Sequence, residues 1–283
     1  MLVSSRELLL DAQRNGYAIG AFNVYNLELT NAVVRAAEDL RAPIFLQLGS
    51  GQLKYGGFAP LVALTRAAAE AAAVPIALHL DHGTQLEAIE RGLAAGFTSI
   101  MVDGSRLALE ENIRLTRRAV EMAHRVGIPV EAELGRLSGS EDAARVIEPA
   151  GELTKPDQVE QFVQETAVDA LAVCIGNVHG FYIGEPQLDF ARLAAIRQQT
   201  TVPLVLHGTS GLSDQTIKEL VARGVVKFNL NTELRVRFFD TLGKAIDKPH
   251  PTYDLRQLMN PVMDAIAELV ASKLELFGSA AKG

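Results

Sequence analysis

Cysteine is nearly absent from this sequence: its 283 residues include one, Cys174. A single cysteine excludes an internal disulfide and any metal cluster built from several thiolates of one chain. No stretch of about 20 apolar residues occurs, and runs such as Val74–Leu78 suit a strand, so we expect no transmembrane helix. The first ten residues carry Arg6 and Glu7 within an apolar run, which is atypical of a signal peptide, and we expect a cytoplasmic protein.

Positive charge is also in short supply. The chain has 27 Lys and Arg against 34 Asp and Glu, which gives a formal net charge of −7. This charge opposes non-specific binding to nucleic acid or to acidic membranes, so we expect neither partner. Any anionic substrate must be held by local groups. Hydrophobic residues make up 48% of the chain and charged residues 22%, which is typical of a globular protein and excludes extensive disorder.

Short apolar runs alternate with helical patterns rich in Ala, Leu and Glu. Strands are predicted at Ala18–Val24, Pro43–Leu48, Pro75–His82, Ser99–Gly104, Pro129–Gly135, Ala170–Val178, Pro203–His207 and Val225–Asn231. Helices are predicted at Leu27–Leu40, Pro60–Ala73, Gln85–Ala95, Leu109–Val126, Pro156–Thr166, Phe190–Gln199, Ser213–Arg223 and Glu233–Ile246. This alternation predicts an α/β protein with the (β/α)8 TIM-barrel fold. A doubly wound sheet is the alternative, but it normally has a Gly-rich turn after its first strand, and Ala21–Val24 has none.

Two segments lie outside this repeat. Ser4–Asn15 is amphipathic, and we expect it to cap the bottom of the barrel. An extra C-terminal helix, at about Pro261–Phe277, is expected to pack on a neighbouring subunit. The chain has no linker, charge block or low-complexity tract, so we predict that residues 1–283 form one domain.

The C-terminal ends of the predicted strands are polar, and the active site of a TIM barrel lies at those ends. His82, His179 and His207 follow three different strands, and three histidines with an open fourth position are a catalytic zinc arrangement. Their separations match no local zinc motif, so only the barrel brings them together. The alternative is that each is a core or rim histidine with an ordinary hydrogen bond. We interpret His79, inside an apolar strand, as structural.

Two further features lie beside this cluster. Asp103 and Glu133 end neighbouring strands, where they form either a second metal position or a structural salt bridge. The run His207–Gly211 offers small residues and backbone N–H groups before a helix, which can cradle a phosphate. Asn229–Thr232 would complete this cradle, although these residues could also form an ordinary helix cap.

These motifs resemble those of the class II, zinc-dependent ketose-bisphosphate aldolases. Ala77–Gly83 and Val130–Gly135, with Glu141 six residues later, are similar to the two signatures of that family. Gly176–Gly180, Leu206–Gly211 and Lys227–Glu233 follow in the family's order, and the resemblance covers almost the whole chain. It implies a lyase of carbohydrate metabolism and glycolysis. The reaction would be reversible cleavage of fructose 1,6-bisphosphate, through a metal-stabilised enediolate, to dihydroxyacetone phosphate and glyceraldehyde 3-phosphate.

The resemblance also implies a role for each matching position. His82, His179 and His207 would bind Zn²⁺, and Asp103 and Glu133 would hold a second or displaced metal. Asp81 would be the acid/base at the C4 oxygen, and Glu141 would exchange the proton of the dihydroxyacetone-phosphate carbon. Dihydroxyacetone phosphate would be bound by Gly180, Gly208, Thr209, Ser210, Asn229, Leu230, Asn231 and Thr232. A monovalent cation, Na⁺ or K⁺, would lie near the carbonyls of Val178 and Gly208.

Some positions depart from the family pattern. Ser50 is shifted relative to the family's phosphate-contacting serine and is only a candidate for that role. Arg256 has a Tyr-Asp-x-Arg context similar to that of an arginine in the family, and we predict that it binds the distal phosphate, across a subunit interface of a homodimer or homotetramer. The loop Arg136–Gly139 is similar to tagatose-bisphosphate aldolases, whereas Asp81–Gly83 and Gly176–Gly180 are similar to fructose-bisphosphate enzymes. A tagatose-1,6-bisphosphate aldolase, or a related ketose-phosphate aldolase, is therefore the main alternative.

Two other functions compete with this one. Lys227 shares a strand face with Asn229 and Asn231, and a buried lysine there could act as the nucleophile of a Schiff-base aldolase. The barrel could also bind a sugar phosphate without catalysis, as a sensor or as an assembly subunit of another aldolase.

Overall fold

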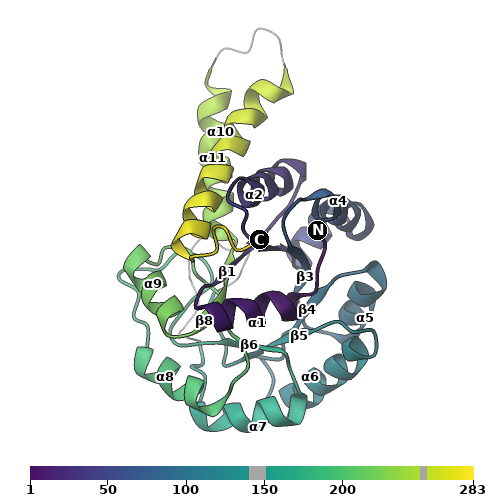
Figure 1. Cartoon of the computed structure of the whole chain (residues 1–283), viewed down its shortest axis with the longest axis vertical. Coiled ribbons are helices and arrows are strands. Elements are labelled where there is room, and N and C mark those ends of the chain that lie inside the picture. The colour runs from purple at the N-terminus through teal and green to yellow at the C-terminus, as the bar shows by residue number, and fades with distance from the viewer. Residues whose placement is uncertain (140–150, 249–253) are drawn as a thin grey trace.

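Eight parallel strands form a closed barrel in the order of the sequence, and helices surround it (Figure 1). The structure is a computed structural model that describes residues 1–139, 151–248 and 254–283. The strands are β1 (Ile19–Asn23), β2 (Ile44–Leu48), β3 (Ile76–Gly83), β4 (Ser99–Val102), β5 (Val130–Leu134), β6 (Ala170–Val173), β7 (Leu204–Leu206) and β8 (Val225–Leu230). The predicted (β/α)8 barrel is confirmed.

The helices between the strands lie close to their predicted positions. They are α2 (Leu27–Asp39), α4 (Phe58–Ala71), α5 (Leu86–Ala95), α6 (Leu109–His124), α7 (Pro156–Thr166), α8 (Phe190–Gln199), α9 (Asp214–Ala222) and α10 (Thr232–Ile246). One short helix, α3 (Ser50–Gly56), was not predicted. Its first turn begins after Gly49, whose N–H donates to Gln52 Oε1, so a side chain rather than a periodic apolar pattern starts it.

Several predicted strands extend beyond the observed ones. β4 ends at Val102, β6 at Val173 and β7 at Leu206, so Asp103, His179 and His207 lie on the loops that follow. After β6, the side chain of Asn177 takes the place of a neighbouring strand. It accepts from the N–H of Ile175 and donates to the carbonyls of Val173 and His207. The strand ends there because a side chain has satisfied the backbone groups that would extend it.

The barrel interior has two layers. Inward-facing apolar side chains fill its lower layer, toward the N-terminal ends of the strands: Ile19, Ala21, Phe45, Ala77, Met101, Ala170, Ala172, Val205 and Val226. Helix α1 (Ser5–Asn15) covers this layer with Leu8, Leu9 and Ala12, as predicted for the N-terminal segment. An upper layer of buried polar side chains lies above it: Asn23, Gln47, His79, Asp81, Glu131, His207, Lys227 and Asn229. The fold thus closes the barrel at one end and concentrates polar groups at the other.

Helix α11 (Leu255–Leu276) begins six residues before the predicted start, and Pro261 lies inside it. Asp254 caps the helix by accepting from the Arg256 N–H, which explains the earlier start. Helix α11 packs against α2 and α10 of its own chain. The expected packing on a neighbouring subunit stays a prediction. Together α10 and α11 form an arm that extends from the barrel (Figure 1).

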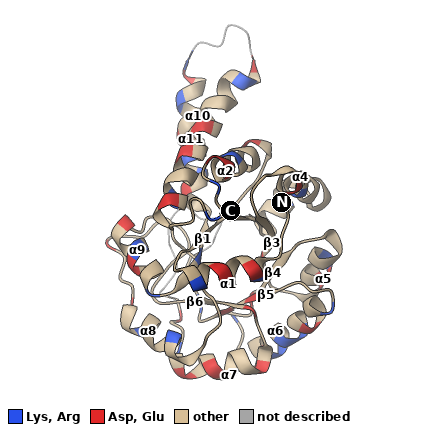
Figure 2. Ribbon diagram, in the orientation of Figure 1, with Lys and Arg blue, Asp and Glu red and all other residues tan. Residues whose placement is uncertain are grey.

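Charged residues are spread over the outer helices and along this arm, with both signs interspersed (Figure 2). None of the helices in the described ranges combines the length and the apolar character that crossing a membrane requires.

Candidate active site

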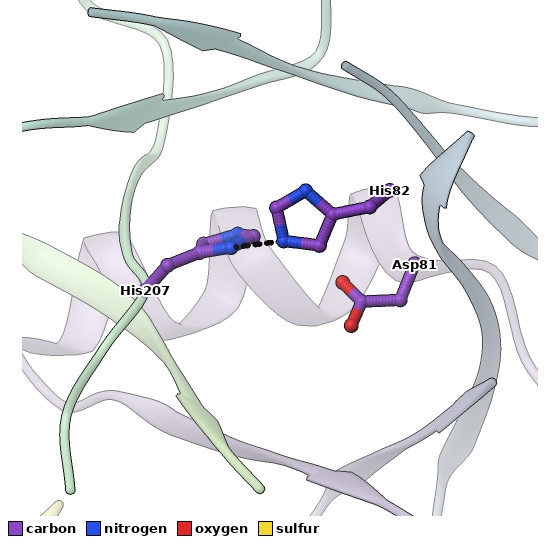
Figure 3. Close-up of side chains that lie close together, drawn as sticks. All are labelled: Asp81, His82 and His207. Carbon is purple, nitrogen blue, oxygen red and sulfur yellow. Dashed lines mark hydrogen bonds between the residues drawn. The ribbon is translucent and has the colours of Figure 1, made fainter. Parts of the chain in front are cut away.

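The three predicted histidines meet at the mouth of the barrel. The ring centroids of His82 and His207 are 4.8 Å apart, those of His82 and His179 are 5.3 Å apart, and those of His179 and His207 are 6.2 Å apart. Asp81 lies beside them. The ligand atoms of Asp81, His82 and His207 lie within 4.8 Å of one another, close enough to share one ion. Figure 3 shows Asp81 and His82 both directed toward His207.

Asp81 and His82 face the same site although they are consecutive residues. In a regular strand, consecutive side chains point to opposite faces, so His82 should point away from the interior when Asp81 points inward. The β3–β4 register shifts between Leu80 and Gly83, and His82 has a left-handed backbone conformation with φ of 49°. A non-glycine residue is strained in this conformation, and such strain is concentrated at functional sites. The strained turn brings the imidazole to the mouth.

Each of two histidines is held by a carboxylate. His82 Nδ1 lies 2.8 Å from Asp103 Oδ2, and His207 Nε2 lies 2.9 Å from Glu131 Oε1. Ionised carboxylates only accept hydrogen bonds, so we assign the protons to these two nitrogens. His82 Nε2 and His207 Nδ1 then both present lone pairs, yet they are 3.0 Å apart (Figure 3). A proton or a metal cation is required between them. Pairing of a carboxylate with the outer nitrogen is the usual support of a metal-binding histidine.

Glu131 is also bound to Lys227. Lys227 Nζ donates to Glu131 Oε2 at 2.9 Å and to Asn229 Oδ1 at 2.8 Å, and both charged side chains are buried. Burial favours the neutral acid, but the charge of Lys227 and the hydrogen bond of His207 outweigh it and hold the pKa of Glu131 well below its ordinary value. The Lys227 amine is buried and donates hydrogen bonds to Glu131 and Asn229, which disfavours the Schiff-base role considered for it.

Asp81 is positioned by amides. Its Oδ2 accepts from Asn23 Nδ2 at 2.9 Å, and Asn23 Oδ1 accepts in turn from Gln47 Nε2 at 3.0 Å. Asn229 Nδ2 lies 3.4 Å from Asp81 Oδ1. Asp81 is 1% exposed, so these donors take the place of water around its carboxylate. The chain of amides fixes the orientation of the carboxylate.

Asp103 and Glu133 form a second group with His82, in which ligand atoms again lie within 4.8 Å of one another. Burial raises the pKa of Glu133 to about 8, with a further contribution from the charge of Asp103. Burial also opposes ionisation of Asp103, but the hydrogen bond and charge of His82 outweigh it, so the pKa of Asp103 is well below the ordinary value. Glu133 Oε2 is buried and has no hydrogen-bond partner among the described residues.

These observations fit a metal cation. The facing lone pairs of His82 and His207, the nearby ring of His179 and the unsatisfied oxygen of Glu133 are donors of the kinds that divalent zinc accepts. Two nitrogens bound to one zinc at about 2.1 Å each stand a little over 3 Å apart, close to the distance between the facing nitrogens.

A small polar cavity lies on the β6–β8 side of His179. Its lining includes most of the residues predicted to bind dihydroxyacetone phosphate: Gly180, Gly208, Ser210, Asn229, Asn231 and Thr232. Thr209 and Leu230 are buried and do not line it. Gly208 has φ of 67°, and a Cβ at this position would lie 2.0 Å from the Val178 carbonyl oxygen, so only glycine fits. The Gly208 carbonyl accepts from the Tyr182 hydroxyl at 2.9 Å.

A larger cavity, of about 220 Å³, lies on the β2–β5 side of His179. Ser50 lines it together with His82, Asp103 and Glu133. Arg256 does not line it: α11 begins at the outer end of the arm (Figure 1), and Arg256 there pairs with Asp254 at 2.7 Å. Glu141 lies outside the described residues.

Several residues of the site were not predicted from the sequence to have a role there. Asn23 and Gln47 position Asp81, Glu131 supports His207, and Arg106 and Arg136 line the larger cavity. Strand periodicity contained a signal for three of them, because Asn23, Gln47 and Glu131 occupy the same face of their strands as other inward residues.

The chain is similar to known proteins over its whole length. The sequence profile of the family described as "Fructose-bisphosphate aldolase class-II" matches residues 3–282. A fructose-bisphosphate aldolase of Helicobacter pylori is 40% identical over an alignment of 306 residues that covers 100% of both chains. The D-tagatose-1,6-bisphosphate aldolase subunit GatY of Klebsiella oxytoca is 42% identical over 277 residues, with 98% of both chains covered.

Similarity extends to the fold. The crystal structure of the YdjI aldolase of Escherichia coli K12 matches with a TM-score of 0.89 and 39% sequence identity, covering 100% of this chain and 99% of that chain. The match therefore includes the arm and the N-terminal helix as well as the barrel.

Proposed function

The chain belongs to the class II fructose-bisphosphate aldolase family, and on that premise we propose that it reversibly cleaves fructose 1,6-bisphosphate to dihydroxyacetone phosphate and glyceraldehyde 3-phosphate. The observation that carries this proposal is the convergence of His82, His179 and His207 beside the buried carboxylate of Asp81. Polar groups on both sides of this cluster can receive the two ends of a bisphosphate.

Class II aldolases are metal-dependent, and the metal proposed here is zinc. His82, His179 and His207 would hold it, with Asp103 and Glu133 available to a second or displaced ion. Once bound, the ion would supply Lewis-acid stabilisation of the negative charge that develops on the ketone and hydroxyl oxygens. Glu131 and Asp103 orient two of the imidazoles through their outer nitrogens.

Two carboxylates are proposed to move protons. Asp81 would take the proton of the C4 hydroxyl during cleavage and return it during condensation, because Asn23 and Asn229 hold its carboxylate beside His82 and His207. Glu141 would exchange the proton on the dihydroxyacetone-phosphate carbon, a role that rests on the family resemblance alone.

The phosphate next to the ketone is assigned to the small cavity. Its lining offers backbone and side-chain donors from Gly180, Gly208, Ser210, Asn229, Asn231 and Thr232. Thr209 and Leu230, their neighbours in the sequence, are proposed to contribute as well. A monovalent cation, Na⁺ or K⁺, would be bound by the carbonyls of Val178 and Gly208. The Val178 carbonyl oxygen lies close to the backbone of Gly208. Ser50 is proposed to contact substrate in the larger cavity.

Arg256 can reach the mouth only from a second copy of the chain, so its proposed role requires a homodimer or homotetramer. A cytoplasmic location is proposed as well. The single, buried cysteine suits a reducing compartment, where structural disulfides are rare.

Tagatose 1,6-bisphosphate, which differs from the fructose compound at C4, is the second candidate substrate. The relative with a tagatose name is 42% identical to this chain and the one with a fructose name 40% identical, so overall similarity favours neither sugar.

The proposal is tested with metal-free and zinc-loaded protein and both bisphosphates. Cleavage should disappear on chelation and return with zinc, and the ratio of kcat/KM values will identify the sugar. Full activity of metal-free protein, verified by elemental analysis, would end the zinc assignment. Substrate-dependent inactivation by borohydride would reveal Schiff-base chemistry, and binding of a bisphosphate without cleavage by the zinc form would show a non-catalytic barrel.

A further inference from the structure

Two loops are joined by hydrogen bonds beside the small cavity. The loop between β6 and α8 carries His179, and the segment that follows β7 carries His207 and Gly208. Asn177 Nδ2 donates to the His207 carbonyl at 3.0 Å. The Tyr182 hydroxyl donates to the carbonyl of the next residue, Gly208, at 2.9 Å. Two side chains that flank His179 in the sequence therefore hold two consecutive carbonyls of the other loop.

The orientation of these two carbonyls sets the direction of the N–H groups that follow them. A trans peptide unit is planar, and its C=O and N–H bonds point in opposite directions. The hydrogen bond to the His207 carbonyl therefore orients the N–H of Gly208. In the same way, the hydrogen bond from Tyr182 to the Gly208 carbonyl orients the N–H of Thr209.

The N–H groups of this segment are available to a ligand. Within residues 1–139, 151–248 and 254–283, those of Gly208, Thr209 and Ser210 donate to no other group of the chain. The next N–H, that of Gly211, donates to Glu233 Oε1 at 2.8 Å. Gly208 and Ser210 line the small cavity, and the Thr209 N–H lies between them in the chain. Successive N–H groups next to a left-handed residue form a concave site for an anion, and Gly208 has φ of 67°.

Tyr182 acts on this segment from outside the site. Its side chain lines neither of the two cavities at the mouth. Burial raises the pKa of its hydroxyl to about 13, so the hydroxyl stays protonated and remains a donor near neutral pH. Glycine has more backbone freedom than any other residue, and a Cβ at Gly208 would lie 2.0 Å from the Val178 carbonyl oxygen. The segment therefore needs a glycine, and contacts such as that of Tyr182 must restrict its freedom.

We propose that Tyr182 is a positioning residue, whose hydroxyl fixes the Gly208–Thr209 peptide so that its N–H is directed to the phosphate of dihydroxyacetone phosphate before binding. This inference rests on the proposed aldolase function and adds to it a residue that touches neither substrate nor metal. Donors that are fixed in advance bind an anion without the entropic cost of ordering a glycine segment. Tyr182 should therefore affect the affinity for the phosphate and leave the chemical step unchanged.

The test compares Tyr182→Phe with the matched control Tyr17→Phe in zinc-loaded protein. The Tyr17 hydroxyl also makes a 2.9 Å hydrogen bond, to Asp11 Oδ2, and burial raises its pKa to about 13 as well. Tyr17 lies in the lower layer of the barrel, far from the phosphate. Exchange of the α-proton with solvent deuterium is measured on dihydroxyacetone phosphate and on dihydroxyacetone, which lacks the phosphate.

Tyr182→Phe should lower kcat/KM for dihydroxyacetone phosphate by about 3–10-fold, through KM, because one hydrogen bond that orders the binding segment is lost. Its exchange with dihydroxyacetone should match that of wild type, and Tyr17→Phe should match wild type with both compounds.

Equal losses with both compounds would overturn the proposal, since Tyr182 would then act on the histidines or on the whole fold. An unchanged KM for dihydroxyacetone phosphate, a loss confined to kcat, or a Tyr182→Phe protein that does not fold would overturn it too. Failure of the proposed function looks different, because zinc-loaded wild type would then catalyse exchange with neither compound.

Discussion

The lower and upper layers of the barrel interior are built from the same strands, a few residues apart, and they have opposite properties. Phe45 and Ala77 face the lower layer, whereas Gln47 and His79, two residues further along β2 and β3, face the upper layer. Phe45 marks the boundary, since its ring contacts His79 edge to face with centroids 5.8 Å apart. Burial of apolar area in the lower layer stabilises the fold. Burial of charge in the upper layer costs solvation, which paired groups offset only in part.

The two layers therefore have different roles, one in stability and the other in activity. The lower layer, covered by α1, gives the barrel a rigid base. The upper layer keeps polar groups in fixed orientations next to the site, which is how functional groups are preorganised. Substitutions in the upper layer should therefore affect activity more than stability, provided that the buried hydrogen-bond network stays intact. Substitutions in the lower layer should affect stability more than activity.

The largest effect on activity is expected from Asp81→Asn in the upper layer. The variant keeps the shape and the contact with Asn23 but loses the base, so cleavage should fall about 10²–10⁴-fold. Exchange of the α-proton of dihydroxyacetone phosphate with solvent deuterium should persist in Asp81→Asn and be lost in Glu141→Ala. Asp240→Asn, an exposed change on α10, serves as control. The opposite pattern of exchange would reverse the two assignments.

Lys227→Met should produce the largest loss of stability, because it leaves the buried carboxylate of Glu131 without its charge partner. We expect about 3–5 kcal/mol less free energy of unfolding in urea, and zinc affinity weaker by about 10–100-fold through the disturbed support of His207. Lys244→Met, at an exposed position of α10, should change neither. The double variant Lys227→Met/Glu131→Gln should recover part of the stability. Wild-type stability and zinc affinity in Lys227→Met would contradict the importance of the buried pair.

Met101→Ala probes the lower layer. Met101 is fully buried there, and its truncation should cost about 2–5 kcal/mol of unfolding free energy. Zinc affinity and kcat of the folded fraction should stay at the wild-type value, in contrast to Lys227→Met. Met101→Leu conserves volume and should cost less than about 1.5 kcal/mol. If Met101→Ala also weakens zinc binding, the two layers are coupled, and the expectation that the lower layer affects only stability is wrong.

The smallest effect concerns Cys174, which follows the end of β6 and carries no charge. Burial raises the pKa of its thiol to about 11, above the value of about 8.5 for a free thiol. The raised folded-state pKa means that the thiol favours folding below pH 8.5 and that this contribution declines as the pH rises toward 11. Alkylation by iodoacetamide at pH 8 should be slow in the folded protein and fast in urea. Fast alkylation of the folded form would show that this part of the site is open.

Much of the fold was predictable because its signals are local. Apolar runs beginning with proline predicted strands, and Ser213, where a helix was predicted to begin, caps α9 by accepting from the Thr216 N–H. Boundaries were less predictable when a side chain replaced a backbone partner. Thr154 lies just before α7, where a threonine often caps a helix, but its hydroxyl instead donates to the Leu134 carbonyl and accepts from the Cys174 N–H, joining the ends of β5 and β6. No local pattern distinguishes these two uses of a threonine.

The sequence by itself determined the eight-fold alternation, the two layers of the interior and the set of histidines and carboxylates at the strand ends. These follow from residue type and from the two-residue period of a strand. Only the tertiary structure determined the orientation of these histidine and carboxylate side chains. His82 reaches the site through a register shift and a left-handed turn, and His207 takes its tautomer from Glu131, 76 residues away in the sequence. Orientation and protonation depend on contacts between distant strands, and those contacts exist only once the barrel has closed.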